Sequence, residues 1–317
     1  MNKILTISIY ILTVFVVQSQ ELYFNTASSG LNIREEPSIN SKKIGKLPYG
    51  STVELLETTK IKLQIIDDEE TINGFWVKIK FSNFPFIVSE REEDLGHDKE
   101  GYVFSGFIEK LNKASVETIE IDSLKFQSLY IPSKPLNKIK ITSEKEAEKL
   151  LVSKVKWKDV EDIGWTIDEI ILDNGQVLNI NQKSNDNYFI AYYPTEAIIV
   201  FEGGHGSEFS ISIKTGESLE TVGNPEYIIE SPNKKIRLNG WFPGQECSSY
   251  FFQEKIGDTY RYLTDFGWGS EEFGENICYF NKFCWLNDKE FMYCYTDHST
   301  NENGVLKYYI GTIVNKN

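Results

Sequence analysis

Short runs in which apolar and polar residues alternate dominate the chain after residue 20. Residues 51–56 (STVELL), 116–121 (VETIEI) and 209–213 (FSISI) are examples. A period of two places every second side chain on the same face, which is typical of a half-buried β-strand. Few segments show the 3.6-residue period of a helix. The pattern therefore predicts an all-β protein built from antiparallel strands.

The first residues have a different pattern. Lys3 is the only charge among residues 1–19, and an apolar run of fourteen residues covers positions 4–17. A membrane-spanning helix needs about 20 apolar residues, so the run has the length of a signal peptide. We expect residues 1–19 to be removed and the mature chain to be exported, either periplasmic or secreted. Because no cysteine lies near the cleavage site, the chain is not expected to carry a lipid anchor, and no later segment predicts a membrane span.

An ordered series of motifs follows the signal. It comprises an extended segment (LNIREEPS), a turn at residues 46–50, the strand at 51–56, then GFWVKIKF and EGYVFSGFIEKL. In order and spacing this series resembles the bacterial SH3 (SH3b) family over residues 22–112. The matching positions are Leu31, Asn32, Ile33, Arg34, Pro37, Ile44, Gly45, Gly50, Val53, residues 74–79, residues 101–103, Phe107 and Ile108. The resemblance implies a small SH3-like barrel over residues 20–112, with a long inserted loop at 82–99.

The resemblance also implies a binding role toward the cell wall or a polypeptide. The ligand contacts would come from Arg34 and Glu35 in the first loop, Tyr49 at the second turn, and Trp76 and Tyr102 on strands. Each has an alternative role. Trp76 and Tyr102 also fit the barrel core, and Arg34 also fits an ion pair with a nearby acid.

A larger β-rich domain is predicted over residues 113–317, after a polar connector at 112–115. One short helix is expected where Ser143 and Glu146 form a capping box. Residues 170–178 predict a hairpin with an Asn-Gly turn. Three irregular units then follow at residues 189–217, 227–258 and 284–313, at a spacing of about 40 to 60 residues. The phrases SPNKKIRL and CWLNDKEFMY of the last two units resemble strand pairs of β-propeller blades. The expected fold is an incomplete propeller-like stack or a sandwich.

Four cysteines, Cys247, Cys278, Cys284 and Cys294, lie in the last quarter of the chain. An even number in an exported chain permits two disulfides with three connectivities. Free buried thiols are the alternative, because the flanking residues are apolar. A structural zinc site is disfavoured, since the spacing lacks the close C-x2-C pairs that such a site uses. We expect no metal and no cofactor.

An enzyme is the main functional alternative. SH3b modules accompany cysteine peptidases of the NlpC/P60 type, and the segment around Cys247 (ECSSYF) is similar to the nucleophile segment of that family, with His298 as the partner. In that family the cysteine opens a helix, which lowers the pKa of the thiol. Here residues 250–263 predict two strands around a Gly-Asp turn. We therefore assign no catalytic residue.

Charge narrows the choice of partner. The chain has 33 basic and 47 acidic residues and a net charge of −14. Nucleic acid is thereby disfavoured, because its phosphates demand a strong basic patch. The sequence indicates an exported, non-catalytic binding protein whose SH3b module recognises a cell-wall peptide, a glycan or a protein. An exported inhibitor or immunity-type protein remains a further alternative.

Overall fold

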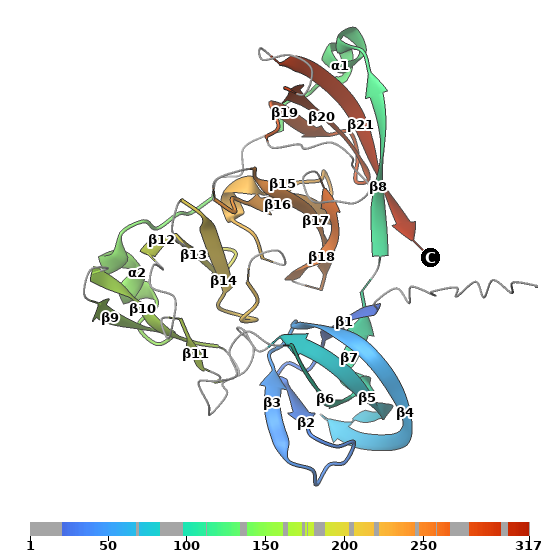
Figure 1. The fold of residues 1–317 in the computed structure, drawn as a ribbon, viewed down its shortest axis with the longest axis vertical. Helices are drawn as coiled ribbons and strands as arrows, with labels where there is room; N and C mark the ends of the chain where they lie inside the picture. Colours follow the sequence, from blue (N-terminus) through green and yellow to red (C-terminus); the bar gives the residue numbers. More distant parts are fainter. Residues whose placement is uncertain are drawn as a thin grey trace, which may run out of the picture.

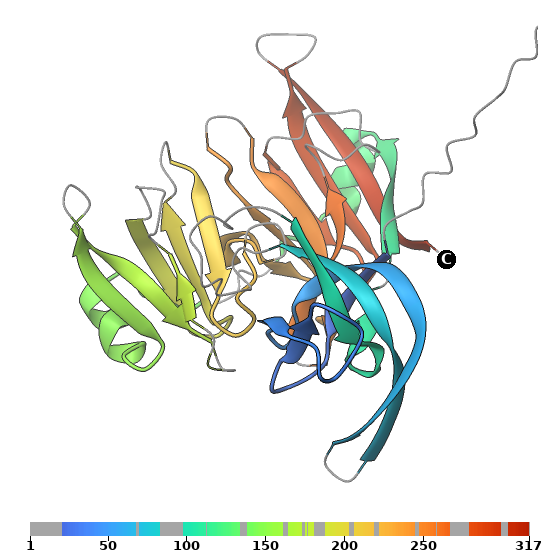
Figure 2. The same ribbon diagram turned by 60° about the horizontal axis from the view of Figure 1, so that its bottom comes forward.

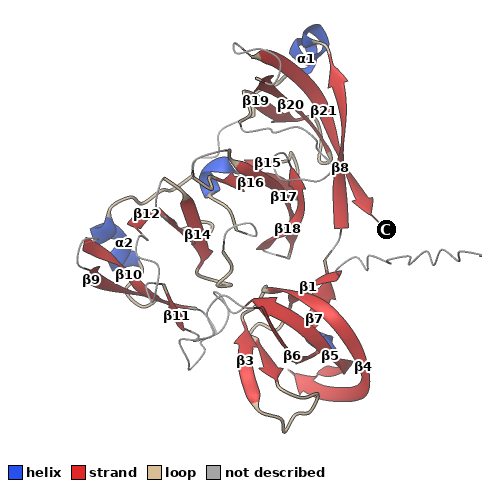
Figure 3. Cartoon of the chain, in the orientation of Figure 1, coloured by secondary structure: helices blue, strands red, loops and turns tan. Residues whose placement is uncertain are grey.

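In a computed structural model the chain forms a small β-barrel and an open row of four antiparallel sheets (Figures 1 and 3). This confirms the predicted all-β class. The structure describes residues 21–67, 70–82, 98–111, 113–133, 138–160, 164–172, 175, 177–180, 188–202, 206–218, 222–244, 247–257, 259–266, 279–298 and 304–316. The expected signal peptide and residues 83–97 of the expected inserted loop lie outside this part of the chain.

The barrel is one seven-stranded sheet with the strand order β3-β2-β6-β5-β4-β1-β7. Its elements are β1 (Glu21–Asn25), β2 (Leu31–Arg34), β3 (Lys43–Leu47), β4 (Thr52–Asp67), β5 (Glu70–Ser82), β6 (Asp98–Phe104), the 3-10 turn η2 (Ser105–Phe107) and β7 (Ile108–Lys110). Alternate residues point inward, and Ile33, Leu47, Ile79 and Val103 are completely buried. The SH3-like barrel expected for this region is confirmed.

The β4–β5 hairpin is longer than the sequence patterns predicted. Its strands contain 16 and 13 residues, and they reach beyond the barrel body (Figure 2). The pairing continues to Asp67 opposite Glu70, with a register shift between Thr58 and Lys62. The alternation continues weakly through KIKLQIID, where Leu63 and others still pack partly against the barrel core. These contacts explain why the strands extend so far beyond the predicted strand at 51–56.

Four sheets follow, which we number along the row. Sheet 1 comprises β9 (Val155–Val160), β10 (Gly164–Ile171) and β11 (Val177–Asn179), and sheet 2 comprises β12 (Tyr188–Tyr193), β13 (Ile198–Glu202) and β14 (Glu208–Ser212). Sheet 3 comprises β15 (Ile229–Glu230), β16 (Ile236–Trp241), β17 (Ser249–Ile256) and β18 (Thr259–Phe266). Sheet 4 comprises β19 (Lys282–Trp285), β20 (Glu290–Asp297), β21 (Val305–Lys316) and β8 (Lys113–Ile121). Sheets 2 to 4 correspond to the three predicted units. Sheet 1 and sheet 4 lie at opposite ends of the row (Figure 1), which fits an incomplete propeller-like stack.

The strand β8 links the barrel to the C-terminal strand β21. It leaves the barrel and pairs antiparallel with β21, with Val116 opposite Ile313 and Thr118 opposite Gly311. The predicted polar connector at 112–115 is therefore wrong, because residues 113–115 already pair with β21. Backbone pairing accepts polar side chains at these positions, and only Ala114 and Val116 need to be buried in the core between sheets 3 and 4.

Apolar side chains fill two of the stacking interfaces. The core between sheets 1 and 2 contains Ile167, Ile170, Ile199 and Phe201. The core between sheets 3 and 4 is aromatic, and its most enclosed members are Phe252, Phe266, Phe291 and Tyr293. Burial of such large rings is the main source of stability for stacked sheets.

Two short helices flank the sheets. The predicted helix is present as α2 (Glu144–Leu150) with Ser143 at its N-cap, but the Ser143 side chain makes no capping hydrogen bond, so the predicted capping box is wrong. The helix α1 (Ser123–Leu129) was not predicted; the Asp122 carboxylate accepts the Lys125 N–H at 2.8 Å and begins it. Neither helix is long and apolar enough to cross a membrane, within the part of the chain described.

The cysteines take different roles. Cys247 is disulfide-bonded. Cys284 on β19 and Cys294 on β20 are free and buried, and burial raises the pKa of both thiols. The four cysteines therefore do not form two disulfides. Cys278 lies outside the described residues.

Candidate functional site

A row of four polar side chains crosses the outer face of the barrel sheet. Register places Glu57 of β4 opposite Lys78 of β5, Lys78 opposite Tyr102 of β6, and Tyr102 opposite Arg34 of β2. Sequence neighbours of these residues, such as Val77 and Val103, point into the core. Because side chains alternate between faces, the four residues of the row point away from the core. We call Glu57, Lys78, Tyr102 and Arg34 the outer-face row.

Two further contacts hold the side chains of Lys78 and Arg34 in position. Lys78 Nζ forms an ion pair with the Glu100 carboxylate, and this hydrogen-bonded contact raises the pKa of Lys78. Arg34 Nη1 donates to the backbone carbonyl of Ser41 at 2.6 Å, which holds the loop that begins at the exposed Glu35. Within the described part of the chain, Arg34 is thus positioned by a carbonyl and not by the acid that its alternative role required. The row places the Tyr102 ring between the two cations Lys78 and Arg34, with the Glu57 carboxylate at the far end beside Lys78.

The other predicted contact residues lie elsewhere. Trp76 is 4% exposed, as its alternative role as a core residue requires, and this leaves it little surface for a ligand. Tyr49 is half-buried in the turn after β3, away from the row. The structure therefore brings together Arg34, Glu35 and Tyr102 and places Tyr49 in a separate turn, whereas Trp76 lies two residues from Lys78 on β5 but is buried.

A second feature of the barrel is a hollow of about 470 Å³ on the β4–β5 hairpin. Its lining comes from Lys62, Leu63 and Gln64 on β4 and Asn73, Gly74 and Phe75 on β5. The Phe75 ring is 37% exposed, and Lys62 Nζ lies 6.0 Å from its centroid. Cation–π contacts of this kind are worth about 0.5–1 kcal/mol at exposed sites. The hollow adds a second exposed aromatic group to the barrel surface.

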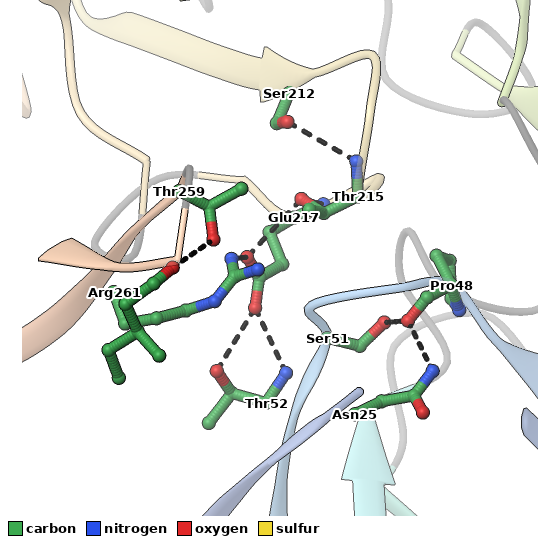
Figure 4. A network of polar contacts seen from close by, with 10 residues as sticks. Asn25, Pro48, Ser51, Thr52, Ser212, Thr215, Glu217, Thr259 and Arg261 are labelled. Carbon is green, nitrogen blue, oxygen red and sulfur yellow. Dashed lines mark hydrogen bonds and ion pairs between the residues drawn. The ribbon is translucent and has the colours of Figure 1, made fainter. Parts of the chain in front are cut away.

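A buried polar network joins the barrel to the row of sheets (Figure 4). The backbone N–H and hydroxyl of Thr52 donate to Glu217 Oε1 at 2.9 and 3.0 Å. Glu217 Oε2 accepts from the Thr215 hydroxyl at 3.2 Å and from Arg261 Nη1 at 3.3 Å. Burial raises the pKa of Glu217, and the nearby Arg261 charge and these hydrogen bonds oppose the shift. Four donors thus stabilise the carboxylate where the barrel meets the sheets.

The turn that carries Tyr49 packs against the same network. Gly50 has a φ of +82°, and a Cβ atom there would lie 1.8 Å from Arg261 Nη2. The Arg261 guanidinium also lies 5.9 Å from the centroid of the Phe24 ring. Glycine is required here for both its backbone conformation and its small size. The Tyr49 turn is therefore part of the contact between the two domains.

Arg34 was predicted from the sequence, but Lys78 and Glu57 of the row and Glu217 and Arg261 of the polar network were not, although two signals were present. In TYRYLTDF, Arg261 falls on the same alternation as Leu263, so the pattern points a cation toward the apolar side of β18. In GFWVKIKF, Lys78 directly follows the buried Val77, so the alternation points Lys78 to the outer face. A charged residue at a strand position that the alternation points inward indicates a buried partner. A charged residue at a position that points outward indicates a surface role.

The structure also bears on the cysteine-hydrolase alternative. The segment after Cys247 forms the strands β17 and β18, as predicted, and not a helix. A disulfide-bonded sulfur is not a thiolate nucleophile. His298 follows the end of β20. Among the described residues, no group of three or more His, Cys, Asp or Glu side chains is placed to hold a metal ion.

Comparison with known proteins identifies the barrel. Residues 29–109 match the family model of the bacterial SH3 domain, which confirms the resemblance found in the sequence. No curated protein and no solved structure matches the chain. The family assignment thus covers the barrel, and the sheets that follow are described by their own geometry.

Proposed function

We propose that the bacterial SH3 domain of this chain binds a cell-wall or polypeptide ligand through the outer-face row, and that the chain is an exported, non-catalytic binding protein. The observation that carries the proposal is the alignment of Arg34, Tyr102, Lys78 and Glu57 across four neighbouring strands of a domain whose family suggests peptide or cell-wall binding. Export rests on the expected signal peptide at residues 1–19.

The chemistry of the row suits a peptide better than a uniformly charged polymer. Tyr102 supplies a flat, amphipathic surface on which an apolar group or a sugar ring can pack. Arg34 can bind a carboxylate in a bidentate manner, because its Nη1 alone is committed to the Ser41 carbonyl. Glu57 is exposed and attracts an amine. A ligand with both an acidic and a basic group, such as a peptide of the cell wall, matches these three side chains.

The first test is co-sedimentation of the mature chain, residues 20–317, with insoluble peptidoglycan sacculi. We expect the protein to move to the pellet and no soluble peptide to be released. Release of peptide that Cys247→Ala abolishes would support the hydrolase alternative instead. Absence of the protein from the pellet, together with recovery of one tightly bound protein from an envelope extract, would favour the inhibitor or immunity-type alternative.

A matched pair of variants tests the assignment to the row. Arg34→Gln removes the cation and preserves much of the side-chain length. Lys60→Gln changes an exposed cation on the strand β4, outside the row. We expect the first variant to lower the pelleted fraction and the second to leave it unchanged. Equal losses would indicate a nonspecific contribution of positive charge.

A further inference from the structure

The interface between sheets 2 and 3 differs from the two apolar interfaces. It contains a partly open cavity of about 190 Å³. The three charged side chains classed as buried among the described residues, Glu217, Arg237 and Arg261, all line this cavity. Burial of charge is costly unless each charge is paired and hydrogen-bonded. Their concentration at one cavity indicates a purpose other than stacking the sheets.

Arg237 is held firmly at the cavity wall. Its Nε donates to Gln253 Oε1 at 2.6 Å, and its guanidinium lies 3.8 Å from the centroid of the Tyr260 ring. The side chain is 8% exposed, and burial lowers its pKa to about 10. The group therefore stays positively charged at neutral pH. A cation that is rigid, charged and adjacent to a cavity is preorganised to bind an anion.

Among the described residues, three buried polar atoms at the same cavity have no hydrogen-bond partner. Arg261 is 4% exposed, and its Nε and Nη2 atoms are buried without a partner, although Nη1 contacts Glu217. Glu196, in the turn between β12 and β13, lines the same cavity, and its Oε2 atom is also buried without a partner. Donors and an acceptor are thus both unsatisfied at one cavity. Buried polar groups are normally satisfied by protein, water or ligand.

We propose that this cavity binds a small zwitterion, an α-amino acid or a short peptide end, with its carboxylate on the guanidinium groups of Arg261 and Arg237 and its ammonium on Glu196. This inference is independent of the proposed function of the barrel.

The balance of charge favours a zwitterion over a simple anion. The cations lining the cavity are Lys214, Arg237 and Arg261, and the carboxylates are Glu196, Glu217 and Glu230. A dianion such as phosphate would be drawn to the cations but repelled by as many carboxylates. A ligand with one charge of each sign meets both sets. The volume corresponds to several water molecules at about 30 Å³ each, which is the size range of an amino acid.

The test is isothermal titration of the mature full chain with glycine, L-alanine and L-glutamate, and with acetate and methylammonium as half-ligands. We expect saturable one-to-one binding of at least one amino acid with a Kd of about 1 mM or tighter. Both half-ligands should bind at least about tenfold more weakly, because each satisfies only one set of partners. Absence of binding by all three amino acids, or acetate binding as tightly as they do, would overturn the proposal.

A matched pair of variants locates the site. Glu196→Gln removes the proposed partner of the ammonium, and Glu202→Gln changes a half-buried glutamate at the end of β13 that does not line the cavity. We expect the first to weaken binding about tenfold and the second to leave it unchanged. Equal behaviour of the two variants would place the ligand elsewhere and refute the assignment. If Glu196→Gln does not fold, Arg237→Lys serves the same purpose, since it keeps the charge but removes the guanidinium donors.

Discussion

Thr52 donates both its backbone N–H and its hydroxyl to a single carboxylate oxygen of Glu217, a residue 165 positions away in the chain. Thr52 opens β4 of the bacterial SH3 domain, and Glu217 follows β14 of sheet 2. The pair therefore links the two parts of the molecule through a partly buried, charge-assisted contact. Hydrogen bonds to a charged group contribute more than neutral ones, typically about 1.5–3 kcal/mol each.

The first prediction concerns this coupling. Thr52→Val removes the hydroxyl donor and keeps the backbone donor, and Glu217→Gln removes the charge. In a double-mutant cycle on urea unfolding we expect a coupling energy of about 1–2 kcal/mol, because the two residues are in direct contact. Thr58→Val, at an exposed position of the same strand, is the control and should not couple with Glu217→Gln. Additive effects of Thr52→Val and Glu217→Gln would contradict the proposed link.

The second prediction is a pH dependence. Burial raises the pKa of Glu217 above its ordinary value of 4.5, so the folded state holds the proton at pH values where the unfolded state has lost it. The stability that this protonation contributes is fully present below 4.5 and is lost as the pH rises through the folded pKa. Wild type should therefore lose unfolding free energy relative to Glu217→Gln over that window. Urea unfolding curves of both proteins, measured across the window, would refute this if they kept a constant difference.

The third prediction tests the close contact of Gly50 with Arg261. Gly50→Ala places a Cβ atom 1.8 Å from Arg261 Nη2 and requires a residue with a side chain at a φ of +82°. Gly257→Ala is a matched control, because Gly257 has a φ of +61° and a Cβ atom added there would meet nothing within 4 Å. We expect the control to lose about 1 kcal/mol from backbone strain alone, and Gly50→Ala to lose about 1–3 kcal/mol more through displacement of Arg261. Thermal unfolding measures the stability loss of both variants. Equal losses would contradict the prediction, because they would show that Arg261 moves aside without a cost in stability.

The fourth prediction concerns the thiols. Burial raises the pKa of Cys284 and Cys294, so few of these groups are thiolates at pH 8, and both lie in the apolar cluster beneath α1. We expect iodoacetamide to leave both unlabelled in the native protein and to label both in denaturant, with mass spectrometry as the readout. Cys247 should be labelled only after reduction. Rapid alkylation of Cys247 in the native protein without reductant would reopen the hydrolase alternative.

The sequence predicted those features that depend on local alternation and turns. The barrel strands, the 170–178 hairpin and the strands around Gly257 all follow such patterns. Sheet 1 was not recognised as a unit, because its strands, such as VKWKDV and GWTIDEII, carry many polar residues. The pairing of β8 with β21 was missed for another reason, since it joins segments almost 200 residues apart, and local patterns contain no information on such partners.

The candidate site was predictable only in part. Arg34 and Tyr102 were identified from the family resemblance, but their alignment with Lys78 depends on strand register across three neighbouring strands. The charges at the cavity between sheets 2 and 3 were beyond the sequence patterns, because Arg237 and Glu196 meet through the stacking of separate sheets. A site whose residues come from different sheets can be recognised only when the tertiary structure is known.

The central claim, that the bacterial SH3 domain binds through its outer-face row, is tested most directly by comparing two tyrosine variants in sacculus co-sedimentation. Tyr102→Ala removes the ring of the row, and Tyr188→Ala removes a 39% exposed ring from β12, on sheet 2. We expect Tyr102→Ala to lower the bound fraction strongly and Tyr188→Ala to bind as wild type, with both variants folded by circular dichroism. Undiminished binding by Tyr102→Ala would contradict the claim.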